Sequence, residues 1–168
     1  MSNNNTHGER LTTETEGVGT VKHDIYAEGI DQYKKAMDNG FYIEAIALME
    51  SIIADRLESL ANYLSNSKIY SYKPAGRLAN ALLGKMSAKL EPYPDVKTAI
   101  TNIRTWLRQR NHAVHEMFKL SEENWKASFK ESYSKLEAPA KEGCELFRDL
   151  DNAIRYMRIE EEKNSNKK

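Results

Sequence analysis

A segment near residue 110 concentrates the side chains best suited to chemistry. It reads Arg108-Gln-Arg-Asn-His-Ala-Val-His-Glu116 and holds two arginines, an asparagine and two histidines. An imidazole titrates near neutral pH and can move a proton, whereas a guanidinium can hold a phosphate through two parallel hydrogen bonds. Attack of an RNA 2′-hydroxyl on the neighbouring phosphate needs proton transfer and charge stabilisation but no metal ion. The segment therefore has the groups that metal-independent RNA cleavage requires.

Four polar residues in and just before this segment share one face if it is helical. At about 100° per residue they fall within about 60° of one another; these four, the polar stripe, are Arg104, Arg108, Asn111 and His115. Asn111 and His115 are one helical turn apart, so an amide and an imidazole can address one ligand atom together. A lone surface histidine is more often just a solvated side chain, and the neighbouring amide is what favours a site here.

Arg110 departs from the polar stripe, because it falls among the apolar residues of the same helix, which include Ile103, Leu107 and Val114. An unpaired charge that faces the core costs several kcal/mol, so Arg110 needs a carboxylate or must reach the edge of the bundle. We expect it to pair with Glu50, which lies at the edge of the apolar face of an earlier helix. A bridge of this kind between two helices is equally well explained as purely structural, and both interpretations stay open.

The elements that must position these residues are all predicted to be helices. Apolar residues recur at spacings of three and four, no window alternates with period two, and Asn39-Gly40 is a typical helix stop. The breaks between these segments predict five helices, over about 24–38, 41–64, 75–90, 95 to beyond 115, and 121–159. Asp24 is the expected N-cap of the first helix, and Pro139 is expected to break or bend the last one. Short connections between such helices favour an all-α, up-and-down bundle of four or five helices.

Composition bounds the rest of the molecule. The 168 residues suit one domain, which we expect over 21–160, between disordered polar tails at 1–20 and 161–168. Lys and Arg (25) balance Asp and Glu (25), so any contact with nucleic acid must be local. The single cysteine, Cys144, permits no intramolecular disulfide, and no apolar run is long enough for a signal peptide or a membrane span. A cytoplasmic protein that makes no membrane contact and needs no cofactor is the expectation.

Arg110-Asn-His-Ala-Val-His115 resembles the Arg-x4–6-His motif of the HEPN superfamily, and residues 35–50 resemble its helix pair joined at a small-residue turn. The resemblance covers about residues 24–120 and implies an HEPN-like bundle that acts as a homodimeric, metal-independent endoribonuclease. It implies catalytic roles for Arg110 (phosphate charge), Asn111 (orientation) and His115 (general acid or base). Glu50 would support Arg110, and RNA would be bound by Arg104, Arg108 and His112.

Members of that superfamily are typically ribonucleases of toxin–antitoxin, phage-defence and RNA-processing systems. For this chain the resemblance implies a toxin–antitoxin or phage-defence role, with an antitoxin or another partner protein. One subgroup carries a tyrosine two residues after the histidine, but this chain has Met117 there, so modification of that tyrosine does not carry over. The alternative function is a catalytically inactive HEPN-like module that binds a protein or RNA.

Two other patterns are weaker. His112-x-x-His115-Glu116 holds two imidazoles and a carboxylate but matches no usual zinc-protease spacing, so we expect no metal site. Four aromatic side chains could stack on bases, although aromatic residues at helical spacing usually belong to the core; they are Trp106, Trp125, Phe129 and Tyr133.

Overall fold

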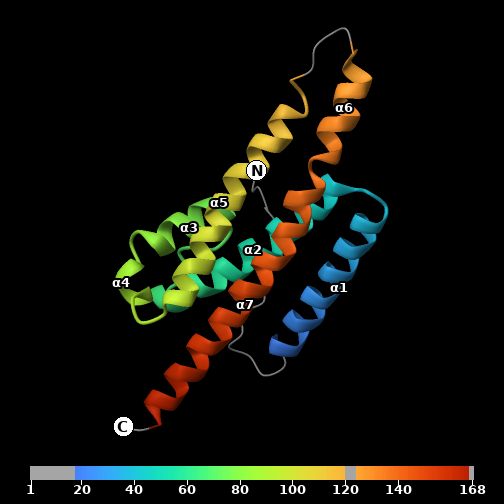
Figure 1. Cartoon of the computed structure of the whole chain (residues 1–168). Helices are drawn as coiled ribbons and strands as arrows, with labels where there is room; N and C mark the ends of the chain where they lie inside the picture. The colour runs from blue at the N-terminus through green and yellow to red at the C-terminus, as the bar shows by residue number, and fades with distance from the viewer. Residues whose placement is uncertain (1–17, 120–123, 167–168) are drawn as a thin grey trace, which may run out of the picture.

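A computed structural model of the chain describes residues 18–119 and 124–166, and every regular element within these ranges is a helix (Figure 1). The helices are α1 (Val18–Asp38), α2 (Tyr42–Ser65), α3 (Ala75–Leu83), α4 (Ser87–Leu90), α5 (Pro94–Glu116), α6 (Trp125–Ser134) and α7 (Glu137–Ser165). The predicted all-α class is confirmed. None of the described helices is both long enough and apolar enough to cross a membrane.

The chain turns between α1 and α2 at the predicted Asn39-Gly40 stop. Gly40 has a φ of +72°, in the left-handed region that glycine adopts without a steric penalty. The predicted start of α1 was wrong, because the helix begins at Val18 and Asp24 lies inside it. The added N-terminal turns are anchored by Lys22, whose ammonium donates hydrogen bonds to Asp55 (3.1 Å) and Ser59 (3.2 Å) on α2.

Two of the predicted helices are each divided in two. The 75–90 segment is interrupted after Leu83, where a Cβ on Gly84 would lie only 2.9 Å from the Asn80 carbonyl oxygen. The C-terminal run breaks at Lys135 and Leu136, and not at Pro139. Pro139 is the third residue of α7, where its missing N–H removes no intrahelical hydrogen bond.

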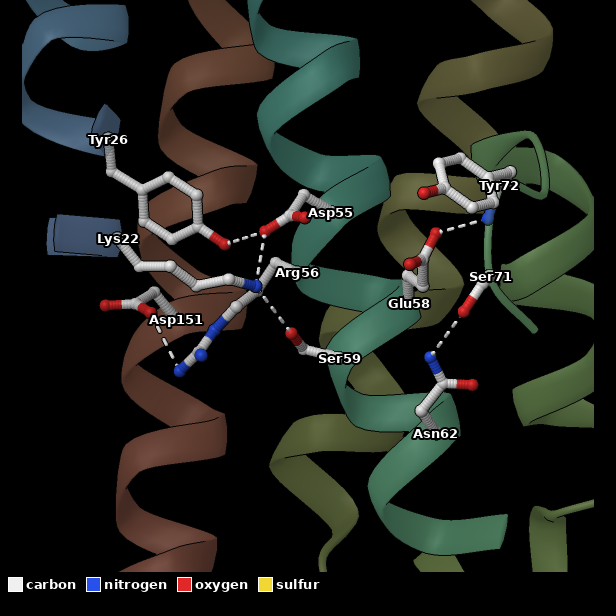
Figure 2. A network of polar contacts seen from close by, with 10 residues as sticks. All are labelled: Lys22, Tyr26, Asp55, Arg56, Glu58, Ser59, Asn62, Ser71, Tyr72 and Asp151. Carbon is white, nitrogen blue, oxygen red and sulfur yellow. Dashed lines mark hydrogen bonds and ion pairs between the residues drawn. The ribbon is translucent and has the colours of Figure 1, made fainter. Parts of the chain in front are cut away.

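Helix α2 is central, with α1, α3 and α7 packed around it, and α5 packs on α3 and α7 (Figure 1). Its apolar face is fully enclosed at Met49, Ile53, Leu57 and Leu60. On the side of α3, the buried carboxylate of Glu58 accepts a hydrogen bond of 2.8 Å from the backbone N–H of Tyr72 (Figure 2). This contact holds the α2–α3 connection against the bundle.

Helices α5 and α7 pack closely at Trp106 and Gly143. Trp106 of α5 is completely buried, and its indole N–H donates a hydrogen bond of 2.8 Å to the Pro139 carbonyl. Gly143 of α7 lies against the indole, and a Cβ there would come within 2.7 Å of Trp106 Cζ2 and 3.2 Å of Met49 Cβ. Glycine is therefore needed at this position for the two helices to approach.

Helix α7 continues to Ser165, past its predicted end near Ile159 and into the stretch 161–168 expected to be a disordered tail. The extension is held by Glu161, whose carboxylate accepts hydrogen bonds from the hydroxyls of Tyr63 (2.6 Å) and Tyr93 (3.1 Å). Most of the predicted N-terminal tail lies outside the described residues.

Candidate functional site

The predicted site lies on the last turns of α5, at one end of the molecule and beside α6 (Figure 1). The last buried residue within α5 is Leu107, and none of the residues of α6 is buried. One side of residues 108–116 is thus exposed, whereas Arg110, Ala113 and Val114 on the other side are partly buried. The core contacts of Trp106 hold the base of this segment in place.

Arg110 is tied back to the bundle by the predicted partner. Its Nη2 forms an ion pair with Oε1 of Glu50 on α2, and the two side chains are only 18% and 30% exposed. The Nε of Arg110 is buried and has no hydrogen-bond partner among the described residues. The expected Glu50–Arg110 pair is confirmed, and its guanidinium is only partly satisfied by protein groups.

The polar stripe, unlike Arg110, is not paired with other protein groups that the structure describes. Arg108, Asn111 and His115 are exposed and Arg104 is half-buried. Within residues 18–119 and 124–166, no side-chain hydrogen bond or ion pair engages any of these four. The stripe is therefore accessible, and its donors and acceptors are available to a ligand.

The structure does not bring all the predicted site residues together. In the described part of the chain, no hydrogen bond or ion pair joins Arg110 to Asn111 or His115. His115 is five positions after Arg110 on the α-helix, so the two side chains point about 140° apart around the axis. Asn111 and His115 remain on one face, whereas Arg110 is held on the flank next to α2.

The two histidines and Glu116 lie at the C-terminal end of α5 without forming a cluster of three metal ligands. The Glu116 carboxylate accepts a hydrogen bond of 2.6 Å from Lys119, which lowers the pKa of Glu116, with smaller contributions from His112 and His115. His112, 78% exposed, lies 3.9 Å from the same carboxylate. Among the described residues, no group of three or more His, Cys, Asp and Glu side chains is placed to hold a metal ion.

The aromatic candidates separate by location. Trp106 belongs to the core, so it is unavailable for stacking on a base. Phe129 and Tyr133 stack on each other with ring centroids 6.2 Å apart, and Tyr133 also contacts Tyr42 at the start of α2. The Tyr133–Tyr42 contact holds α6 to the bundle. Trp125 is 54% exposed, the most accessible of the four, and the Lys126 ammonium lies 5.4 Å from its ring centroid.

Sequence reasoning missed a second polar cluster on the other side of α2. There Arg56 pairs with Asp151 of α7 at 2.9 Å, and Tyr26 of α1 donates a hydrogen bond of 2.5 Å to Asp55 (Figure 2). The available signal was a charged residue within the apolar face of α2, at Arg56. Its partner is 95 residues away and could not be identified from helical periodicity.

Taken together, the geometry supplies an exposed amide and imidazole on one face, and a partly buried guanidinium held on the neighbouring flank. This set can hold an anion and transfer a proton. Comparison of the chain with protein-family models, with curated proteins and with solved structures gives no match in any of the three. Function must therefore be inferred from the residues of α5 themselves.

Proposed function

We propose that this protein is a metal-independent endoribonuclease of the HEPN type, in which His115 is the general acid or base, Arg110 stabilises phosphate charge, and Asn111 orients the phosphate or the histidine. One observation carries the proposal: Asn111 and His115 are exposed and unengaged by described side chains, on a helix where Arg110 is anchored nearby. A histidine needed for packing or for a structural ion pair would not be left open in this way.

The reaction needs two proton transfers and no redox step. A neutral imidazole accepts the proton of an RNA 2′-hydroxyl as that oxygen attacks the adjacent phosphorus. The bond from phosphorus to the 5′-oxygen breaks, and an imidazolium returns a proton to this leaving oxygen. The products are a 2′,3′-cyclic phosphate and a free 5′-hydroxyl. Arg110 and Asn111 hydrogen-bond the phosphate oxygens, on which negative charge increases in the transition state.

A homodimer suits this chemistry better than a single chain. The imidazole and guanidinium of one copy diverge by about 140° around α5, so one chain alone has difficulty applying both to one phosphate. Two copies whose α5 ends face each other provide two imidazoles, one to accept and one to donate a proton. The exposed Arg108 and His112, together with the half-buried Arg104, would then flank the RNA and supply local cations in a chain with no net charge.

The resemblance to the HEPN superfamily favours a cytoplasmic role in a toxin–antitoxin or phage-defence system, with an antitoxin or another partner protein as restraint. The alternative function is a catalytically inactive module of the same type that binds a protein or RNA. The Arg110–Glu50 ion pair favours this alternative, because a bridge between α5 and α2 is itself a sufficient reason for an arginine at this position. Binding of RNA without cleavage would support it.

The decisive variant is His115→Ala, assayed for cleavage of a mixed-sequence RNA in the presence of a chelator. Because His115 is exposed, we expect an unchanged melting temperature and loss of all cleavage. Gln109→Ala is the matched control, since Gln109 is exposed on the same helix, less than two turns from His115, but lies outside the polar stripe. Equal cleavage by His115→Ala and the parent protein would exclude the assigned role.

A further inference from the structure

A groove with a volume of about 420 Å³ runs between α1 and α7. Both helices pack on α2 and lie side by side in Figure 1. The groove is lined from α1 by residues such as His23, Tyr26 and Ile30, and from α7 by residues such as Phe147, Arg148 and Arg155. None of these belongs to the α5 site, so the groove is a separate feature of the molecule.

The floor of the groove is aromatic. Tyr26 and Phe147 meet edge to face, with ring centroids 5.7 Å apart and planes at 83°. The Tyr26 hydroxyl is directed toward α2, where it donates a hydrogen bond of 2.5 Å to Asp55 (Figure 2). Its polar atom is therefore used inside the bundle, and the ring contributes apolar surface to the groove. Phe147 is only 5% exposed, so the accessible aromatic surface is mainly the Tyr26 ring, against which a flat apolar group would be favoured.

Positive charge exceeds negative charge among the residues that line the groove. The Asp151 carboxylate forms ion pairs with two guanidiniums, those of Arg56 (2.9 Å) and Arg155 (2.7 Å). The Asp55 carboxylate pairs with the Lys22 ammonium and accepts a hydrogen bond from the Tyr26 hydroxyl. Arg148 forms no ion pair or hydrogen bond with any side chain that the structure describes. Among the residues that line the groove, Arg148 and Arg155 stand against one carboxylate, Asp151, which is a local excess of one positive charge.

The cations on the rim are placed to act together. Arg148 and Arg155 are seven residues apart on α7, which is about two turns, so they project from the same face about 10 Å apart along the axis. Both side chains are exposed, and Arg155 uses its Nε on Asp151, which leaves its terminal nitrogens available. Guanidiniums in this arrangement suit the tetrahedral oxygens of a phosphate.

We propose that the α1–α7 groove binds a small aromatic phosphate, whose ring lies against Tyr26 and whose phosphate is held between Arg148 and Arg155. The volume accommodates a ring system with one phosphate, and the charge excess is what an anion of this kind neutralises. This binding does not depend on the ribonuclease proposal, because the two sites share no residue.

The test is titration of the full-length protein with 1-naphthyl phosphate, followed by calorimetry and by NMR shifts of the amides of α1 and α7. Inorganic phosphate and 1-naphthol are the two partial probes. We expect 1-naphthyl phosphate to bind at least about tenfold more tightly than either, because each partial probe lacks one half of the recognition.

Two variants keep the test independent of folding. Arg148→Gln should weaken 1-naphthyl phosphate binding about tenfold by removing a charge-assisted contact, whereas Arg77→Gln, an exposed arginine on α3, should not change it. Ala27→Leu fills the groove from an exposed position of α1 and should abolish binding while the melting temperature is retained. No saturable binding below about 10 mM, or equal binding by the parent and both groove variants, would overturn the proposal.

Discussion

Substitutions of Arg110 separate the two roles that its position implies, anchoring α5 and stabilising a phosphate. Arg110→Ala removes the guanidinium and leaves the Glu50 carboxylate without its partner. Arg110→Lys keeps the charge but loses the planar pair of donors that can grip a carboxylate or phosphate bidentately. If both roles are real, the two variants should differ in stability and agree in lacking activity.

The expected magnitude follows from the exposure of the pair. Breaking a fully buried ion pair by removing one partner costs about 3–5 kcal/mol. Here the arginine and glutamate side chains are 18% and 30% exposed, so water reaches both and reduces the penalty. We expect about 2 kcal/mol for Arg110→Ala, and less than about 1 kcal/mol for Arg110→Lys. In a chain of this length, about 2 kcal/mol corresponds to a fall in melting temperature of about 4–8 °C.

Melting temperature and RNA cleavage should be measured on the same preparations, with Glu50→Ala and the double variant completing a thermodynamic cycle. A coupling free energy of about 1 kcal/mol or more between positions 50 and 110 would establish the ion pair as stabilising. If Arg110→Ala and Arg110→Lys both melt like the parent and both cleave RNA, Arg110 has neither role. If both are destabilised but their folded fraction cleaves RNA at the parental rate, Arg110 is structural and has no part in catalysis.

Three further predictions concern the metal requirement, the α5–α7 contact and alkaline stability. RNA cleavage should continue in excess chelator, and loss of activity that a single divalent ion restores would contradict the proposed mechanism. Gly143→Ala should lower stability by about 2 kcal/mol through the 2.7 Å approach to Trp106, whereas Gly76→Ala, whose Cβ would meet open space, should be neutral or slightly stabilising in thermal melts. The pKa of Tyr26 is raised, mainly by burial and then by the negative charge of Asp55. The unfolded chain therefore ionises this tyrosine at a lower pH than the folded protein does. Stability should therefore fall as pH rises above about 10, and urea titrations at two pH values should show a smaller fall for Tyr26→Phe.

Several features of the fold and the site were predictable from the sequence because they depend on neighbours along the chain. The apolar spacing of 41–64 reflects one face of a single helix, and that segment matches α2 closely. Asn39-Gly40 was recognised as a turn because glycine adopts the positive φ observed at Gly40. A rotation of about 100° per residue places Asn111 and His115 on the exposed side of the helix and directs Arg110 toward α2.

Other features depended on residues far apart in the sequence. The extension of α7 beyond Ile159 relies on hydrogen bonds from Tyr63 and Tyr93, nearly 100 and 70 residues away from Glu161. Pro139 marked a break in the pattern, but the chain breaks just before it because proline fits the first turn of a helix. Helical periodicity describes one helix at a time, whereas the points at which helices begin and end here depend on which other helices they contact.

By itself, the sequence determined the helical class, the α1–α2 turn, and the separation of Arg110 from the polar stripe, since each of these is a property of one helix or one turn. Only the tertiary structure decided that Trp106 is enclosed against Gly143, that Arg56 is neutralised by Asp151, and that a groove opens between α1 and α7. The physical reason is that burial and charge pairing arise between surfaces of different helices. A single helix specifies which face is apolar, but the packed bundle selects the face that covers it.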